Sequence, residues 1–157
     1  MPDPAQLDFQ GAVAQFHEAF DVVNDIVTPE KFRELLERRV TLISEEAKEV
    51  AEAIDAVHHA IGNTDYTGYP VGLVEHLAKE LADLLYVIFG TADLLGIPLD
   101  KAFAEVHESN MSKLGEDGQP VLREDGKVLK GPNYREADMT EVGIDSLTHY
   151  LGLQVAV

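Results

Sequence analysis

Apolar residues recur at the three- and four-residue spacing of an amphipathic helix in several parts of the chain. The four segments with this spacing cover residues 9–25, 28–61, 70–96 and 97–115. Thr28-Pro29 opens the second segment as an N-cap followed by a first-turn proline. Gly96 and Gly115 stand where the third and fourth segments are expected to end. The pattern therefore predicts an all-α protein with a four-helix bundle.

Beyond Gly115 the pattern changes to turn-forming residues. Asp-Gly turn signals lie at residues 117–118 and 125–126, and a pair of apolar residues stands on each side of the second turn. A short β-hairpin is expected there, followed by weak helical spacing around residues 144–150. We expect one domain over residues 1–157, with a bundle at about 5–115 and a tail at 116–157.

Two of the expected helices carry two apolar stripes each, about 100° apart around the helix axis. In segment 28–61 the principal stripe, expected to face the core, contains Leu36, Val40, Ile43, Ala47, Val50, Ile54, Val57 and Ile61. Its side stripe contains Leu35, Leu42, Ala53 and Ala60. In segment 70–96 the principal stripe contains Val74, Leu77, Leu81, Leu84, Leu85, Ile88, Ala92 and Leu95. The corresponding side stripe contains Leu73, Val87 and Leu94.

Carboxylates lie along both side stripes, where apolar neighbours would disfavour a charge. Glu46 and Glu49 occupy the first stripe, Glu80 and Asp83 occupy the second, and Glu45 falls toward solvent. A charge among apolar side chains costs several kcal/mol unless it is paired or binds a metal. Because Lys and Arg are scarce, we expect a cation rather than salt bridges to neutralise the four acids.

The spacing of these acids suits a hard divalent cation. Carboxylates three residues apart project from one helix face within reach of a common ion. Oxygen ligands without imidazole or thiolate favour Mg²⁺, with Mn²⁺ as a substitute. The plainer interpretation is that these are surface acids on the rim of a bundle. Two such pairs on neighbouring helices favour the metal site.

Composition and charge narrow the function further. The chain has 157 residues, 29 of them acidic and 12 basic, and its formal net charge of −17 disfavours binding to nucleic acids or anionic membranes. The absence of cysteine excludes disulfides and thiolate chemistry. The first residues lack the features of a signal peptide, and no apolar run is long enough to span a membrane. A cytoplasmic protein is therefore expected.

The sequence around the carboxylates resembles the all-α NTP pyrophosphohydrolase superfamily, which includes the MazG-like proteins and the dimeric dUTPases. The superfamily's EExxE motif stands here at residues 45–49 and its ExxD motif at residues 80–83. VHESNMSKLGEDGQPV, at residues 106–121, is similar to the fourth-helix segment of the family, and KVLKGPNY, at 127–134, to the tail of some members. The resemblance covers about residues 30–135.

This resemblance implies hydrolysis of a nucleoside triphosphate to the monophosphate and pyrophosphate. The metal ligands that it implies are Glu46, Glu49, Glu80 and Asp83, the same four residues that the side stripes select. It favours dUTP as the substrate and removal of unwanted nucleotides as the role. Phosphoribosyl-ATP pyrophosphohydrolase activity is the alternative within the superfamily. Whether water attacks the α- or the β-phosphorus is left open.

Cleaving a phosphoanhydride requires neutralisation of charge, positioning of the phosphates and activation of a water molecule. Glu46 or Glu49 is the candidate general base, and Glu45 could instead orient a ligand without touching the metal. Either of the first two could equally act only as a ligand.

Basic and polar residues near the fourth segment are candidates for phosphate or sugar contacts. Asn110 and Lys113 are three residues apart and can share a helix face, although a lysine there could simply complement the helix dipole. With the resemblance, we expect Asn110 and Lys113, and more weakly Lys130 and Tyr134, to contact the substrate.

Three aromatic or imidazole side chains have ordinary structural interpretations. His76 lies between Glu80 and Asp83 in angle but is expected to be a helix-end histidine rather than a ligand. Phe16 and Phe20 could stack on a base, although core packing is the expected role.

Two other functions are alternatives for this sequence. A di-iron carboxylate bundle is disfavoured because the sequence contains no Glu-x-x-His motif. A non-catalytic acidic interaction module is the other rival, and it would bind no metal. Because the two long helices carry more apolar surface than one bundle buries, a symmetric homodimer is predicted, as in the related dimeric enzymes.

Overall fold

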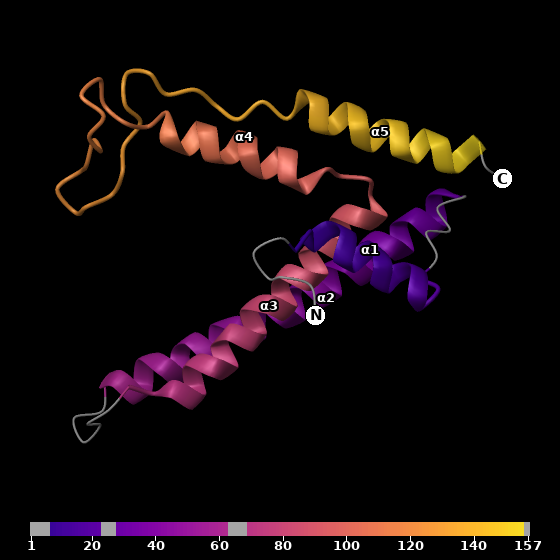
Figure 1. The fold of residues 1–157 in the computed structure, drawn as a ribbon, viewed down its shortest axis with the longest axis horizontal. Coiled ribbons are helices and arrows are strands. Elements are labelled where there is room, and N and C mark those ends of the chain that lie inside the picture. The colour runs from indigo at the N-terminus through magenta and orange to yellow at the C-terminus, as the bar shows by residue number, and fades with distance from the viewer. Residues whose placement is uncertain (1–6, 23–27, 63–68, 156–157) are drawn as a thin grey trace. The chain divides into compact units, whose positions relative to one another are not determined.

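The computed structural model describes residues 7–22, 28–62 and 69–155 and consists of helices joined by irregular segments (Figure 1). The five helices are α1 (Phe9–Ala19), α2 (Pro29–Gly62), α3 (Val71–Leu94), α4 (Leu99–Met111) and α5 (Thr140–Val155). No β-strand occurs in the described part of the chain. The prediction of an all-α fold is confirmed, and each of the four expected helices is present.

The chain divides into two compact units. The first contains Met1–Leu95 together with Gly152–Val157, and the second contains Gly96–Leu151. Helices α1, α2 and α3 belong to the first unit, whereas α4 and most of α5 belong to the second. The assignment of residues 1–157 to one domain stays a prediction.

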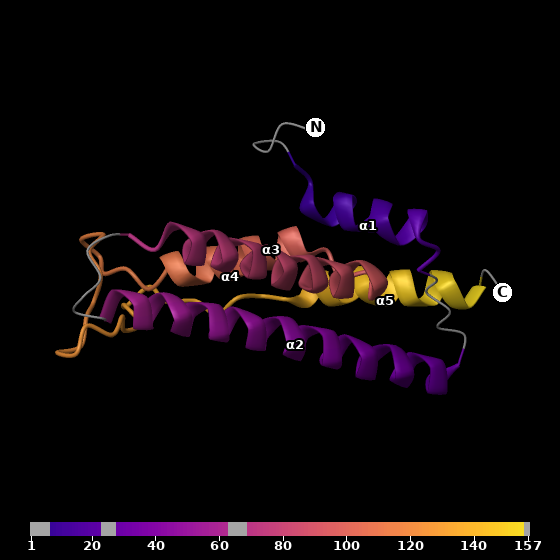
Figure 2. The same ribbon diagram turned by 90° about the horizontal axis from the view of Figure 1, so that it is seen from below.

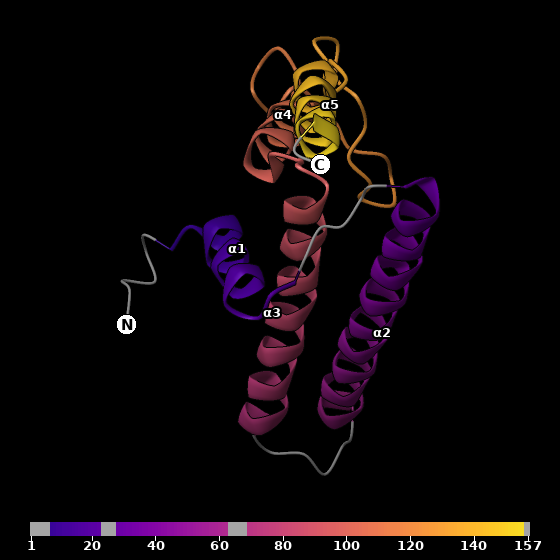
Figure 3. The same cartoon turned by 90° about the vertical axis from the view of Figure 1, so that its right-hand side faces the viewer.

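The first unit is organised around an antiparallel pair of long helices. α2 and α3 run side by side, and α1 packs against α3 (Figures 2 and 3). The rings of Phe9 and Phe89 stack with their centroids 5.6 Å apart. Phe16 meets Tyr86 edge to face, also at 5.6 Å between centroids. These aromatic contacts hold α1 on α3.

Burial on α2 and α3 follows neither predicted stripe alone. On α2 the buried apolar residues are Val50 of the principal stripe and Ala53 of the side stripe, whereas Val40 and Ile54 of the principal stripe are 65% and 49% exposed. On α3, Ala92 of the principal stripe and Leu94 of the side stripe are buried, and Leu81 of the principal stripe is exposed. The principal stripes are therefore only partly buried. The amphipathic pattern shows that two apolar faces exist but does not determine which face meets the neighbouring helix.

Local capping explains where α2 begins. The hydroxyl of Thr28 accepts a hydrogen bond from the Lys31 amide at 3.3 Å, and its carbonyl accepts one from the Phe32 amide at 3.0 Å. The predicted N-cap is confirmed. The helix continues to Gly62, one residue beyond the predicted end, and the connection at residues 63–68 lies outside the described part of the chain.

The ends of α1 and α3 differ from the prediction by a few residues. Helix α1 ends at Ala19, not near residue 24, because Asp21 adopts a left-handed backbone with φ of 52°. The predicted end at Asn24-Asp25 itself lies outside the described residues. Helix α3 ends at Leu94, and Gly96 follows with φ of 61°, the conformation expected after a helix C-terminus.

In the second unit, α4 and α5 are linked by an ion pair between Lys101 Nζ and Asp145 Oδ2 at 2.7 Å. Between the two helices, the expected hairpin is reduced to isolated bridges, Leu114 with Pro120 and Leu122 with Val128. The Asp-Gly turn is present, but the apolar residues beside it are exposed and so gain little from extending the ladder. The weak spacing around residues 144–150 does correspond to a helix, α5.

Within the described residues, no single helix is both long and apolar enough to cross a membrane.

Candidate metal centre

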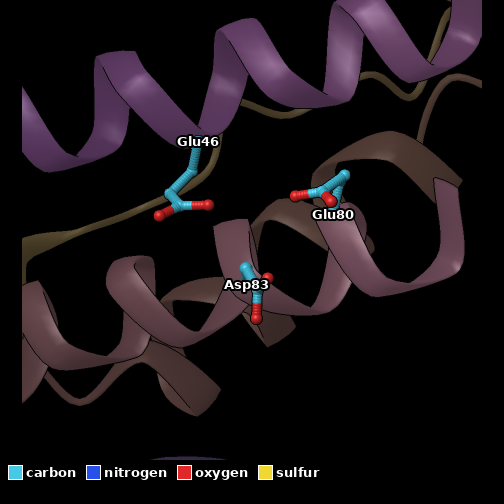
Figure 4. Close-up of side chains that lie close together, drawn as sticks. All are labelled: Glu46, Glu80 and Asp83. Atoms are coloured by element: carbon cyan, nitrogen blue, oxygen red, sulfur yellow. The ribbon is translucent and has the colours of Figure 1, made fainter. Parts of the chain in front are cut away.

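Three carboxylates meet where α2 lies against α3. Glu46 projects from α2 toward Glu80 and Asp83 on α3 (Figure 4). One carboxylate oxygen from each residue lies within 4.8 Å of the other two. The three-residue spacing of Glu80 and Asp83 places both on the α2-facing side of α3. The structure thus brings together three of the four residues that the sequence selected as metal ligands.

Glu80 is the most deeply buried member of this cluster, with 2% of its surface exposed. Its Oε1 atom has partners, but its Oε2 atom has none, and among the described residues no other buried side-chain nitrogen or oxygen lacks a partner. A buried charged oxygen without a partner is costly, so such atoms require an explanation. A bound cation would supply one.

Lys79 and His76 contact the carboxylates from α3 itself. Lys79 Nζ donates to Glu80 Oε1 at 3.1 Å and to Asp83 Oδ2 at 2.6 Å, and His76 Nδ1 lies 3.1 Å from Glu80 Oε1. The hydrogen bond to Asp83, followed by that to Glu80, raises the pKa of Lys79 and keeps its ammonium group charged. Scarcity of Lys and Arg led us to expect a cation rather than salt bridges here, but one lysine does pair with two of the four acids. The four-residue spacing of Lys79 and Asp83 was the signal that could have revealed it.

Glu49 lies beside the cluster without being one of its three converging members. It is exposed, one turn of α2 beyond Glu46. A hydrogen bond shared with the Glu80 carboxylate raises the pKa of Glu49, and repulsion from Glu46 adds to the shift. Glu45 is exposed as well and is not part of the converging group. The ionisation of Glu49 therefore depends on the charge of the cluster, because ionised Glu80 and Glu46 both oppose it.

The residues present fit a hard divalent cation. All the converging atoms are carboxylate oxygens, the donor type that Mg²⁺ and Mn²⁺ prefer. One of the carboxylates is buried and has a free oxygen, whereas Asp83 has a side chain that is 43% exposed and faces water. An ion bound here could therefore keep water or phosphate oxygens among its ligands.

The predicted substrate-binding residues all lie in the second unit, and the structure brings them together in two pairs. Lys113 Nζ donates to Asn110 Oδ1 at 2.7 Å, and Lys130 Nζ lies 4.0 Å from the centre of the Tyr134 ring. The amide of Gly131 donates to the Lys113 carbonyl at 3.0 Å and so joins the two segments. Any side chain at Gly131 would collide with the Leu114 carbonyl, which explains why glycine stands there.

A second buried polar group in the first unit was missed by the sequence analysis. Arg39 of α2 is 8% exposed, and its guanidinium donates to the Val87 carbonyl at 2.6 Å and to the Thr91 hydroxyl at 2.9 Å. Burial, and after it repulsion from Arg38, lowers the pKa of Arg39. His17 of α1 is also buried and contacts Asp93 at 2.6 Å. Arg39 follows Leu35 by four residues on the same side stripe, and that was the available signal.

The aromatic candidates for base stacking contact one another and α3. Phe16 lies 4.5 Å from Phe20 between ring centroids and meets Tyr86 edge to face, but it is 39% exposed, so it is not part of the buried core. Phe20 is 69% exposed.

The all-α fold and the carboxylate cluster between two long helices agree with the resemblance to the all-α NTP pyrophosphohydrolase (MazG-like) superfamily. The family model described as phosphoribosyl-ATP pyrophosphohydrolase matches residues 13–110, more than half of the 157 residues. The chain belongs to this family. The predicted superfamily is therefore confirmed. No match was found among the curated proteins.

Proposed function

We propose that the chain is a Mg²⁺-dependent enzyme that hydrolyses the α–β phosphoanhydride of a nucleotide and releases the monophosphate and pyrophosphate. The family supports pyrophosphohydrolase chemistry. The observation that carries the metal dependence is the convergence of Glu46, Glu80 and Asp83, together with the buried oxygen of Glu80, Oε2, that has no partner. Mn²⁺ is expected to substitute for Mg²⁺, since both prefer oxygen ligands.

Phosphoribosyl-ATP is the leading substrate candidate, because the matched family is described by that activity. It replaces dUTP, which the motif resemblance favoured, as the first substrate to test. A nucleoside triphosphate such as dUTP stays the second candidate for one reason. The segment with Lys113, Lys130 and Tyr134, which carries part of the motif resemblance, lies beyond the matched residues 13–110.

In this proposal, Glu46, Glu80 and Asp83 hold the cation, and Glu49 is either a further ligand or the general base. The bound cation supplies charge neutralisation for the phosphates and favours ionisation of the attacking water. Glu49 can take either role because it is exposed beside the cluster, one turn of α2 beyond Glu46. Lys113 and Asn110, with Lys130 and Tyr134, contact the phosphates and sugar.

The products of hydrolysis test this proposal. Purified protein is incubated with Mg²⁺ and, separately, phosphoribosyl-ATP, dUTP, dCTP and ATP, and the mono- and diphosphates, pyrophosphate and orthophosphate are resolved. Equal amounts of monophosphate and pyrophosphate without a diphosphate are expected. Stepwise release of orthophosphate would identify a different phosphatase. Absence of hydrolysis and of metal binding would favour the non-catalytic interaction module. Faster turnover of dUTP than of phosphoribosyl-ATP would reverse only the choice of substrate.

We also propose that the protein is a cytoplasmic homodimer. The support is the set of exposed apolar side chains along α2, where Val40, Ile54 and Ile61 are 65%, 49% and 60% exposed. A symmetric partner would cover such side chains. Light scattering at micromolar concentration should give twice the chain mass of 17.2 kDa. A mass equal to that of one chain would contradict the dimer and leave the reaction class untouched.

A further inference from the structure

Lys79 is the basic side chain in closest contact with the carboxylate cluster. Its ammonium group binds two of the three converging residues at once, Glu80 Oε1 at 3.1 Å and Asp83 Oδ2 at 2.6 Å. The lysine side chain itself is 63% exposed, whereas that of Glu80 is 3% exposed. The exposed ammonium group of Lys79 thus pairs with the buried carboxylate of Glu80.

One ammonium group leaves this cluster incompletely neutralised. Glu46, Glu80 and Asp83 contribute up to three negative charges, and Glu49 stands beside them. His76 approaches the same Oε1 atom of Glu80 that Lys79 already contacts, at 3.1 Å. The Oε2 atom receives nothing. Lys79 therefore pairs with Glu80 Oε1 and Asp83 Oδ2 and leaves Glu80 Oε2 without a partner.

We propose that Lys79 is the resident counter-ion of the metal-free cluster, and that a divalent cation binds by displacing its ammonium group and so competes with it for Glu80 and Asp83. This inference rests on the metal site of the proposed function. It adds a residue outside the two carboxylate motifs that sets the affinity for the cation.

The displacement breaks two contacts of unequal cost. The pair with Asp83 is exposed and solvent-screened, whereas the contact with buried Glu80 is the one that the cation must replace, and the flexible stem of Lys79 can return the ammonium group to water. A divalent cation carries twice the charge and takes about six oxygen ligands, so it can bind one carboxylate oxygen each from Glu46, Glu80 and Asp83. Exchange is favoured because the ammonium group of Lys79 leaves Glu80 Oε2 without a partner, and a divalent cation compensates more of the Glu80 charge.

Calorimetric titration of the metal-stripped full-length chain with Mn²⁺ tests the exchange. Lys79→Gln removes the competing charge and should bind Mn²⁺ about three- to tenfold more tightly than the wild type, the scale of one charge a few ångströms away. Its melting temperature without metal should fall, so that the increase on adding Mn²⁺ becomes larger. Lys79→Met should behave in the same way, and Lys79→Arg, which keeps a cation in place, should not gain affinity.

The matched control is Lys48→Gln. Lys48 pairs with Glu52 at 3.5 Å on an exposed face of α2, and its removal changes the net charge equally. Its affinity for Mn²⁺ should stay within about twofold of the wild type, because Lys48 pairs with Glu52 instead of with a converging carboxylate and exposed charges are screened. Unchanged or weaker binding in both neutral Lys79 variants, beside normal wild-type binding, would overturn the role of Lys79 alone. Failure of the wild type to bind Mn²⁺ would overturn the metal site itself, and this proposal with it.

Discussion

The contact between α2 and α3 contains two buried charged side chains, Arg39 and Glu80, which the protein accommodates differently. Arg39 is 8% exposed and directs its guanidinium to neighbours on α3, the Val87 carbonyl and the Thr91 hydroxyl. Glu80 is 2% exposed, and one of its two carboxylate oxygens has no partner at all. The arginine is satisfied within the fold, whereas the glutamate is not.

The difference shows that burial of a charge does not by itself indicate a ligand site. A buried cation with good internal acceptors stabilises a helix pair or at least costs it little. A buried anion with an unpartnered oxygen, next to two further carboxylates, destabilises the pair until something binds. On this account Arg39 serves the fold and Glu80 serves the function, and the two should respond oppositely to substitution.

The largest effect is expected from Glu80→Gln. This change keeps the shape of the side chain but removes the charge that the cation requires. Pyrophosphate release should fall by roughly 100-fold or more, beyond the 10–100-fold that residues supporting a metal ligand typically contribute. The metal-free protein should be at least as stable as the wild type, because an unsatisfied buried charge has been removed. Retained activity, or a marked loss of stability, would place Glu80 with Arg39 as a structural residue.

Arg39→Met should give the opposite result. Loss of two charged hydrogen bonds across α2 and α3 should lower the free energy of unfolding by about 2–3 kcal/mol. For a chain of this length, that corresponds to a decrease of several degrees in melting temperature. The upward shift on adding Mn²⁺ should remain. Arg38→Met, on the exposed neighbouring position, is the control and should change neither quantity appreciably.

Lys113→Ala extends the comparison to the second unit. The contact of Lys113 with Asn110 is exposed and contributes little to stability. If the ammonium group instead contacts a phosphate, KM should rise or kcat/KM should fall by about tenfold. Affinity for Mn²⁺ in the absence of substrate should not change. Normal kinetics would indicate an ordinary lysine at the end of α4.

The smallest effect concerns Glu49 and pH. Its folded-state pKa lies above the ordinary value of 4.5, chiefly through the hydrogen bond shared with Glu80, so the folded protein holds this proton more tightly than the unfolded chain does. The resulting stabilisation is complete below about pH 4.5 and is lost as the pH rises through the folded-state pKa. Without metal, Glu49→Gln should therefore gain in melting temperature relative to the wild type as the pH rises. Glu45→Gln should not, and a difference independent of pH would contradict the coupling.

The sequence was sufficient to predict the helices and to select the acids. Thr28-Pro29 and Gly96 mark the ends of elements through local backbone chemistry, which does not depend on the rest of the fold. Glu46, Glu80 and Asp83 stood out because carboxylates interrupted an apolar stripe on each of two helices. Such interruptions can be recognised wherever the helical period is clear.

What the sequence could not determine was how the helices are rotated about their axes. Helix α2 carries two apolar stripes, and which of their residues become buried depends on the partner helix. It also depends on Arg39, whose burial requires hydrogen-bond acceptors in α3. The pairing of Lys79 with Glu80 and Asp83 was obscured because counting basic residues over the whole chain says nothing about their positions. The hairpin was overestimated since turn chemistry is local, whereas strand pairing needs a covered face.

The central claim, that the cluster around Glu80 is a divalent-cation site, is tested most directly by calorimetry on the metal-stripped wild-type chain. Titration with Mn²⁺ at neutral pH should show saturable binding, and the melting temperature should rise with Mn²⁺ concentration as mass action requires. Glu80→Gln, measured beside it, should show neither response. Absence of saturable binding in the wild type, or equal binding in Glu80→Gln, would contradict the account.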